Sequence, residues 1–192
     1  MLEIVLIRPG CTDYDLQGRI QGNLDVPLNE QGIGEMSRVV EEVRGLGIEV
    51  VYSPCCEPAM QAGRILADAL DVKLKKMDRM HNLNQGLWQG MLIEEVRLKQ
   101  PKVYRQWQEH PEHVCSPEGE MLFSAAERVE TAMTKLLKRH NDGVIALVIP
   151  EPLATLVRRF VNHDEIGDLW KAIEEHGRWQ VLTVKPALAH TG

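Results

Sequence analysis

The chain has 192 residues, of which 44% are hydrophobic and 26% are charged, as is ordinary for a globular protein. Its 22 Lys and Arg residues are outnumbered by 28 Asp and Glu residues, which gives a net charge of −6. An acidic chain with only short apolar runs is neither a typical nucleic-acid binder nor a membrane-spanning protein. The start of the chain lacks the basic segment and cleavage site of a secretion signal, so we expect a cytoplasmic protein.

The first half of the chain alternates apolar runs with amphipathic segments, the pattern of strands and helices. In chain order it predicts a strand at 2–7, a helix from Asn29 to Gly45, a strand at 48–52, a helix from Pro58 to Leu70 and a short strand near 72–77.

Residues 78–118 are more polar and irregular, and predict a small lid insertion with a helix around 92–108 that Pro101 interrupts. The second half then predicts a long helix at 119–140, a strand at 144–149, a helix at 151–161 and a strand at 178–184. Such alternation predicts one domain over residues 1–192, a three-layer α/β/α sandwich with a mostly parallel sheet.

Ligands of such sheets bind beyond the carboxyl ends of the strands. Three of these ends carry a distinctive sequence, namely Arg8-Pro9-Gly10, the segment from Ser53 to Glu57, and Pro150-Glu151. We therefore expect the functional site where these three segments meet.

The same segments resemble motifs of the histidine phosphatase superfamily, the phosphoglycerate mutase-like family. The family's R-H-G-x-T is similar to the segment Arg8 to Thr12, and its S-P-L-x-R-A is similar to the segment Ser53 to Pro58. A segment of type G-R-x-Q-G-x-x-D-x-P-L-x-x-x-G is matched from Gly18 to Gly32, and P-x-G-E is matched from Pro117 to Glu120. The resemblance implies a phosphoglycerate mutase-like fold over nearly the whole chain.

The resemblance also implies where the family's catalytic groups fall. The phosphoryl-accepting His falls on Pro9, the second phosphate-binding Arg on Glu57, the proton-donating Glu on Asn82 and the second His on Glu151. Only Arg8 keeps the family's residue.

These replacements remove the family's chemistry in physical terms. A proline ring has no lone pair with which to attack phosphorus, and Asn82 has no titratable proton to donate. Glu57 and Glu151 would place carboxylates where a phosphate needs cations. We therefore expect no catalytic residue and no enzyme activity, but a pseudophosphatase with a binding, regulatory or structural role. Residual phosphomonoesterase or mutase-type activity, and a new acid/base chemistry of Glu57 with Glu151, are the alternatives.

A buried Arg8 needs carboxylate partners, so we expect it to pair with Glu57, Glu151 or both. The predicted pocket contains residues that follow the strand ends or fall at family site positions; they are Arg8, Thr12, Asp15, Gln21, Glu57, His81, Asn82 and Glu151. We expect no cofactor, and as partner an unidentified ligand or protein, with the chain a monomer or homodimer.

Other chemistry-bearing residues receive structural interpretations. The histidines and glutamates between Glu109 and Cys115 do not have a tight zinc-site spacing, so we expect a solvated loop and no metal. His176 lies among charged residues and is expected to face solvent. Trp88 and Trp107 are expected to pack the lid.

Overall fold

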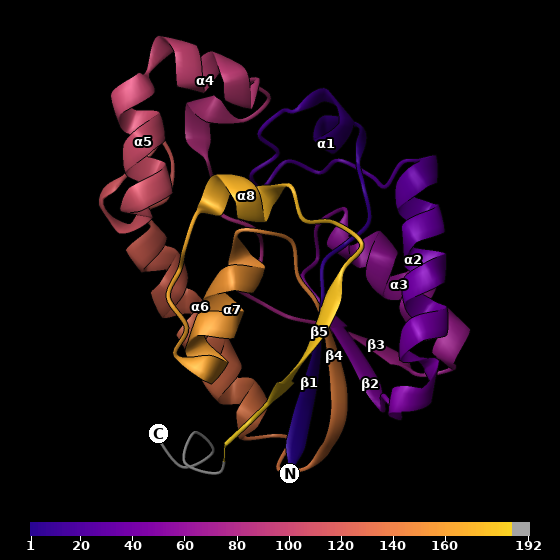
Figure 1. The fold of residues 1–192 in the computed structure, drawn as a ribbon. Coiled ribbons are helices and arrows are strands. Elements are labelled where there is room, and N and C mark those ends of the chain that lie inside the picture. Colours follow the sequence, from indigo (N-terminus) through magenta and orange to yellow (C-terminus); the bar gives the residue numbers. More distant parts are fainter. Residues whose placement is uncertain (186–192) are drawn as a thin grey trace.

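The computed structural model describes residues 1–185 and has five strands in one sheet, with the order β3-β2-β4-β1-β5 (Figure 1). The strands are β1 (Leu2–Ile7), β2 (Val50–Ser53), β3 (Lys73–Lys76), β4 (Gly143–Val148) and β5 (Trp179–Thr183). β1, β2, β3 and β4 are parallel, and β5 runs antiparallel to β1 at the edge. The predicted α/β fold with a mostly parallel sheet is confirmed.

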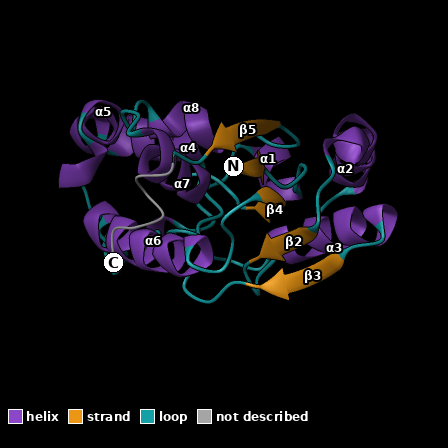
Figure 2. Cartoon of the chain, turned by 90° about the horizontal axis from the view of Figure 1, so that it is seen from below, coloured by secondary structure: helices purple, strands orange, loops and turns teal. Residues whose placement is uncertain are grey.

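Helices cover both faces of this sheet (Figure 2). α2 (Glu30–Val43) and α3 (Ala59–Leu70) lie on one face, and α6 (Leu122–Leu137) and α7 (Leu153–Asn162) lie on the other. Strand β1 supplies both cores, because successive side chains of a strand point to opposite faces. Val5 and Ile7 join the core under α2 and α3, while Ile4 and Leu6 join the core under α6 and α7.

The sequence places α2 tightly against the loop that follows β1. The side chain of Asn29 caps the helix by accepting a hydrogen bond from the amide of Gly32 at 2.9 Å. Gly10 and Gly32 then touch backbone to backbone, and a Cβ on Gly10 would come within 2.2 Å of the Gly32 carbonyl oxygen. This close approach brings the first turns of α2 beside the site described below.

The segment after β3 forms a helical lobe beside the sheet. It contains α4 (Ile93–Lys99), α5 (Pro101–Glu109) and the short 3₁₀ turns η2 (Gly86–Trp88) and η3 (Pro111–His113). Pro101 separates α4 from α5, as the sequence predicts. Trp88 and Trp107 are 2% and 1% exposed and pack edge to face, which confirms that they form the interior of this lobe. That the whole chain is one domain with a lid stays a prediction.

Three short elements complete the structure. η1 (Arg44–Leu46) extends α2, while α1 (Asp13–Gln17) and α8 (Leu169–Ile173) lie above the carboxyl edge of the sheet (Figure 1). The sequence pattern does not predict α1 or α8, because five residues are too few to show helical periodicity. Among residues 1–185 no helix is long and apolar enough to cross a membrane.

Candidate active site at the carboxyl edge of the sheet

A small open pocket lies at the carboxyl edge of the sheet, where the sequence predicts a site. Its cavity volume of about 40 Å³ is room for a few water molecules. The lining residues come from the loops after the parallel strands, from α1 and the loop after it, and from the end of α8 and the segment after it; they are Pro9, Gly10, Asp15, Ile20, Gln21, Gly22, Pro58, Asn82, Gln85, Pro150, Glu151, Pro152, Ile173, Glu175 and His176.

Arg8 and Glu151 form a buried ion pair beneath this pocket. The Arg8 Nε donates to Glu151 Oε1 at 3.0 Å, and the two side chains are 3% and 2% exposed. The other carboxylate oxygen of Glu151 accepts from the backbone amide and the hydroxyl of Thr155 in the first turns of α7. The predicted pairing of Arg8 with Glu151 is confirmed.

Arg8 nevertheless keeps hydrogen-bonding capacity. Its Nη2 lies 3.8 Å from Glu175 Oε2, an ion-pair distance but too long for a hydrogen bond. Within residues 1–185, neither terminal nitrogen of Arg8 has a hydrogen-bond partner. Its guanidinium therefore has donors left for a ligand.

Glu57 does not pair with Arg8 or line the pocket. Its Oε2 accepts a hydrogen bond from the backbone amide of Gln61 at 2.9 Å, at the start of α3, and this contact turns the carboxylate away from Arg8. Glu57 and Glu151 therefore do not form the acid/base pair that the sequence leaves open. Each instead accepts a backbone amide four residues further along the chain.

Asn82 lies at the pocket but is occupied by structural hydrogen bonds. Its amide nitrogen donates to the carbonyl oxygens of Gly22 and Glu151, at 3.0 and 2.9 Å. Its oxygen accepts from the amide of Leu83. Asn82 therefore connects three loops of the pocket wall.

The other predicted pocket residues divide into two groups. Asp15 and Gln21 line the pocket, and Asp15 also closes a capping box with the backbone of Thr12 at the start of α1. Thr12 itself is buried outside the lining, and His81 is exposed and outside it as well. Partial desolvation of its ring, followed by the positive charge of Arg128, lowers the pKa of His81.

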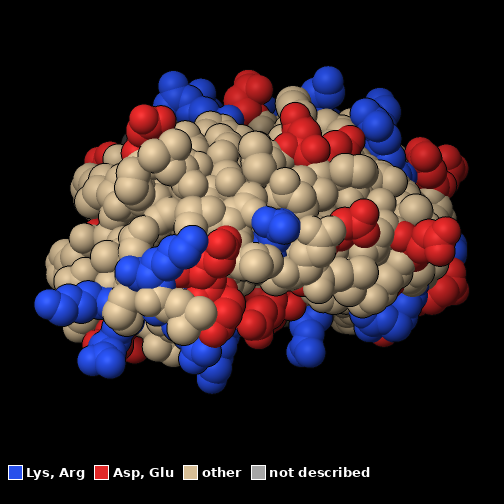
Figure 3. Space-filling view, turned by 90° about the horizontal axis from the view of Figure 1, so that it is seen from above, with Lys and Arg blue, Asp and Glu red and all other residues tan. Residues whose placement is uncertain are grey.

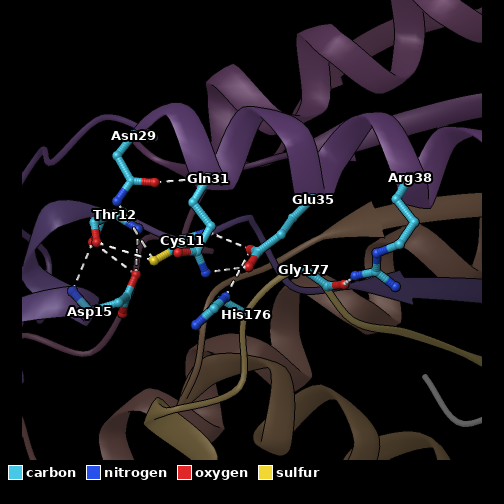
Figure 4. Close-up of polar contacts among 10 residues, drawn as sticks. Cys11, Thr12, Asp15, Asn29, Gln31, Glu35, Arg38, His176 and Gly177 are labelled. Carbon is cyan, nitrogen blue, oxygen red and sulfur yellow. Dashed lines mark hydrogen bonds and ion pairs between the residues drawn. The ribbon is translucent and has the colours of Figure 1, made fainter.

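A histidine of the pocket wall pairs with a carboxylate behind it, and the sequence pattern does not indicate this pair. His176 Nδ1 lies 2.8 Å from Glu35 Oε2, and His176 lines the pocket while Glu35 projects from α2 (Figure 4). Glu35 is fixed from two further sides, by the backbone amide of Cys11 at 2.9 Å and by the side-chain amide of Gln31 at 2.9 Å.

These contacts determine which atoms of Glu35 and His176 carry a proton. Burial is the largest effect on Glu35 and by itself raises its pKa, but the hydrogen bonds from Gln31, His176 and Cys11 together lower it. An ionised carboxylate can only accept hydrogen bonds. In the neutral ring Nδ1 therefore carries the proton, and Nε2 has a free lone pair; Figure 4 shows Nε2 on the side of the ring away from Glu35.

Backbone contacts place His176 next to the position where the family has its nucleophile. The amide of Gly177 donates to the carbonyl oxygen of Pro9 at 2.8 Å, and the amide of Arg8 donates to the carbonyl oxygen of Arg178. Gly177 has a φ of 57°, and a Cβ there would lie 2.8 Å from Glu35. Only glycine fits this turn without strain, so Gly177 is the sequence signal that could have pointed to the pair.

The thiol beside this pair is not an activated nucleophile. Cys11 is buried, and burial together with the nearby carboxylates of Asp15 and Glu35 raises the pKa of its thiol, although a hydrogen bond from Asn29 opposes the shift. The thiolate is the nucleophilic form of cysteine. Cys11 is therefore not the nucleophile of this pocket.

The pocket wall is acidic. Asp15, Glu151 and Glu175 line it, and the buried Arg8 beneath faces two of these carboxylates. On the surface above the carboxyl edge, Figure 3 shows acidic and basic side chains interspersed, with uncharged surface between them. The excess of carboxylates is thus confined to the pocket. It favours a ligand that carries a cationic group in addition to its anionic group.

The fold and this site define a phosphoglycerate mutase-like protein, with a mostly parallel sheet and a pocket at its carboxyl edge. A sequence model of the histidine phosphatase superfamily (branch 1) matches residues 4–187. The chain belongs to this superfamily.

Relatives with assigned names are similar over most of the chain. Phosphoserine phosphatase 1 of Hydrogenobacter thermophilus is 31% identical over 183 residues, which are 95% of this chain and 86% of that protein. A probable phosphoglycerate mutase of Yersinia pestis is 30% identical over 138 residues, 72% of this chain but only 64% of that protein.

Solved structures share the fold at lower identity. A mycobacterial glucosyl-3-phosphoglycerate phosphatase, solved with VO3, superposes with a TM-score of 0.85 at 18% identity, covering 97% of this chain and 93% of that one. A phosphoserine phosphatase of Entamoeba histolytica superposes with a TM-score of 0.76 at 19% identity, covering 94% and 90% of the two chains.

The prediction that the chain is not an enzyme is therefore wrong. A relative that matches nearly the whole chain is named a phosphatase, and the fold is that of named phosphatases, which points to an enzyme. The prediction rests only on the four positions 9, 57, 82 and 151. It leaves out an imidazole that reaches the pocket from the distant segment at His176.

Proposed function

We propose that the chain is a phosphomonoester hydrolase in which His176, oriented by Glu35, replaces the imidazole that position 9 lacks. The observation that carries this proposal is the 2.8 Å contact between Glu35 and Nδ1 of His176, a residue of the pocket wall; within residues 1–185 the other ring nitrogen, Nε2, has no hydrogen-bond partner. A base held by a carboxylate through its other ring nitrogen is the arrangement used for general base catalysis.

In the proposed reaction a water molecule is the nucleophile. Its oxygen forms a bond to phosphorus while the bond from phosphorus to the ester oxygen breaks. His176 Nε2 takes the proton of the attacking water, and the imidazolium returns a proton to the departing alcohol. The products are inorganic phosphate and the alcohol. Pro9 takes no covalent part, because it has no side-chain nucleophile.

Two groups support the binding of the phosphate. The terminal nitrogens of Arg8 have no hydrogen-bond partner within residues 1–185, and neither does the side-chain amide of Gln85, a pocket residue that is 2% exposed. Charge-assisted donors of the Arg type are the stronger ligands of phosphate oxygens. Gln85 adds a neutral donor at the pocket wall.

The acidic wall directs the choice of substrate. Phosphoserine carries an ammonium group beside its phosphate, and Asp15 and Glu175 offer carboxylates to such a group. The relative from Hydrogenobacter thermophilus is named phosphoserine phosphatase 1. We propose phosphorylated amino acids and amines as the substrate class.

A matched pair of substrates tests this function. Phosphoserine and 3-phosphoglycerate differ in an ammonium group against a hydroxyl group, and phosphate release from each is measured with the purified protein. We expect phosphoserine to be hydrolysed with a kcat/KM at least about tenfold higher, the size of one charge contact of about 1.4 kcal/mol. Equal rates for the two compounds would contradict the substrate class. Release of phosphate from neither compound nor from p-nitrophenyl phosphate would contradict the proposed hydrolase.

The remaining expectations stay predictions. They are the cytoplasmic location, the monomeric or homodimeric state and the single domain with a lid.

A further inference from the structure

A group of metal-ligand side chains lies outside the active site, at the end of α5 and in the 3₁₀ turn η3. It consists of His110, Glu112 and His113, whose ligand atoms all lie within 4.8 Å of one another. From its spacing alone this segment is expected to be a solvated loop. Its conformation brings the three side chains to one side.

The turn explains the clustering. The amide of His113 donates to the carbonyl oxygen of His110 at 3.1 Å, and Pro111 between them is buried and anchors the turn. In a 3₁₀ turn the side chains at positions i and i+3 lie above one another. The rings of His110 and His113 are accordingly 6.1 Å apart, centroid to centroid.

Glu112 completes a three-point arrangement. Its Oε1 lies 3.5 Å from His110 Nδ1 and 3.9 Å from His113 Nδ1. Ligand atoms of a tetrahedral ion such as Zn²⁺ lie about 2.1 Å from the metal and so about 3.4 Å from one another. The three side chains are exposed, so small rotations bring them to that spacing without disturbing packed residues.

The surroundings favour a cation. His110 and Glu112 line a groove with a volume of about 780 Å³, and Asp164, Glu165 and Asp168 line the same groove. Among the described residues that line this groove, Arg159 is the single lysine or arginine. A concave surface with an excess of carboxylates attracts cations and disfavours anions.

We propose that His110, Glu112 and His113 form a binding site for one divalent transition-metal ion. Two imidazoles with one carboxylate select Zn²⁺, Ni²⁺, Co²⁺ or Cu²⁺ over Mg²⁺ or Ca²⁺, which prefer oxygen ligands. Because the side chains are exposed, water completes the coordination of the ion. The site is separate from the active site, since neither His110 nor Glu112 lines that pocket.

Equilibrium dialysis of the full chain, free of any histidine tag, against ZnCl₂ in the presence of excess MgCl₂ tests this proposal. We expect one equivalent of Zn²⁺ to bind the unaltered protein, and the variant H110A/H113A to bind at least about 100-fold more weakly. The variant H163N is the matched control. It removes an exposed histidine of the same groove that is not in the cluster, and Asn tolerates the left-handed backbone there (φ 61°).

Cu²⁺ bound to the same proteins gives a second readout by electron paramagnetic resonance. We expect nitrogen hyperfine coupling from two imidazoles in the unaltered protein and from one in H113A. Unchanged Zn²⁺ binding by H110A/H113A would assign the metal elsewhere and overturn the proposal. Binding of less than about 0.1 equivalent of Zn²⁺ at about 100 μM ZnCl₂ would also overturn the proposal, as would displacement of the bound Zn²⁺ by MgCl₂.

Discussion

At the scale of single residues, the most consequential contact of the site is the pair of His176 with Glu35. Its two partners are separated by 141 positions in the sequence. Neither residue stands in a motif, and His176 is surrounded by charged neighbours in the chain, so the sequence alone predicts a solvent-facing side chain. The fold brings His176 beside Pro9. The pocket therefore has a histidine, although it comes from a different segment of the chain than the family's histidine at position 9.

Glu35 is proposed as a positioning residue, and this role can be separated from a merely structural one. In the variant E35Q the imidazolium form of His176 loses its carboxylate partner. We expect kcat for phosphoserine hydrolysis to fall about tenfold in E35Q while KM changes little, because the imidazole is no longer held in place. A kcat equal to that of the unaltered protein would show that Glu35 does not act through His176.

The same residue gives a stability signature with a defined sign. The pKa of Glu35 lies below its ordinary value of 4.5 in the folded protein. Its contribution to the free energy of unfolding is therefore present above about pH 4.5 and is lost as the pH falls through the lower folded value. We expect the difference in Tm between the unaltered protein and E35Q to shrink as the pH falls below 4.5. A difference that grows on acidification would contradict this sign.

The buried pair of Arg8 and Glu151 can be tested by a double-mutant cycle. The variant E151Q leaves the guanidinium, only 3% exposed, without its partner. We expect a loss of about 3–5 kcal/mol in the free energy of unfolding for E151Q, of which the double variant R8M/E151Q recovers a large part. Losses that simply add in the double variant would show that the two side chains are not coupled. Chemical denaturation provides the measurement.

At the scale of elements, the segment between α8 and β5 determines the site. It places Glu175 and His176 at the pocket wall, and its glycine permits the close approach to α2. The carboxyl ends of β1 and β4 contribute Pro9 and Pro150, as the alternation of strands and helices predicts. The segment that carries Glu175 and His176, in contrast, precedes the antiparallel edge strand β5. The expectation that sites lie beyond the carboxyl ends of parallel strands therefore does not point to it.

Gly177 allows the contribution of this loop to be measured. The variant G177A has to place a Cβ 2.8 Å from Glu35 at a φ of 57°. The matched control is G47A, because Gly47 has a φ of 72° but a Cβ added there would meet nothing within 4 Å. We expect the free energy of unfolding of G47A to fall by only about 1–2 kcal/mol, the cost of a left-handed backbone at a non-glycine residue. G177A is expected to lose more stability and also the phosphatase activity; equal losses for the two variants would contradict the close contact.

At the scale of the whole molecule, the fold could be predicted from the sequence and the site only in part. Periodicity and turn residues predict each of the five strands to within two residues, because buried strands and amphipathic helices leave local signals. The resemblance carried by the motifs around Arg8 and Gly18 implies the family, which the match over residues 4–187 shows.

The orientation of the side chains could not be predicted in the same way. Glu57 and Glu151 both precede a proline at a strand end, and in sequence they are equivalent candidates for pairing with Arg8. Only Glu151 reaches Arg8, while Glu57 turns to the backbone of α3. The difference arises from packing between distant segments, which a local pattern does not contain.

The central claim is that an imidazole at position 176 supplies the chemistry that Pro9 excludes. The most direct test is the steady-state kcat/KM for phosphoserine of the unaltered protein, of H176Q and of the control H163N, with phosphate release as the readout. We predict a loss of about 100-fold or more for H176Q, the usual contribution of a general base, and no change beyond about twofold for H163N. Turnover by H176Q equal to that of the unaltered protein would contradict the claim.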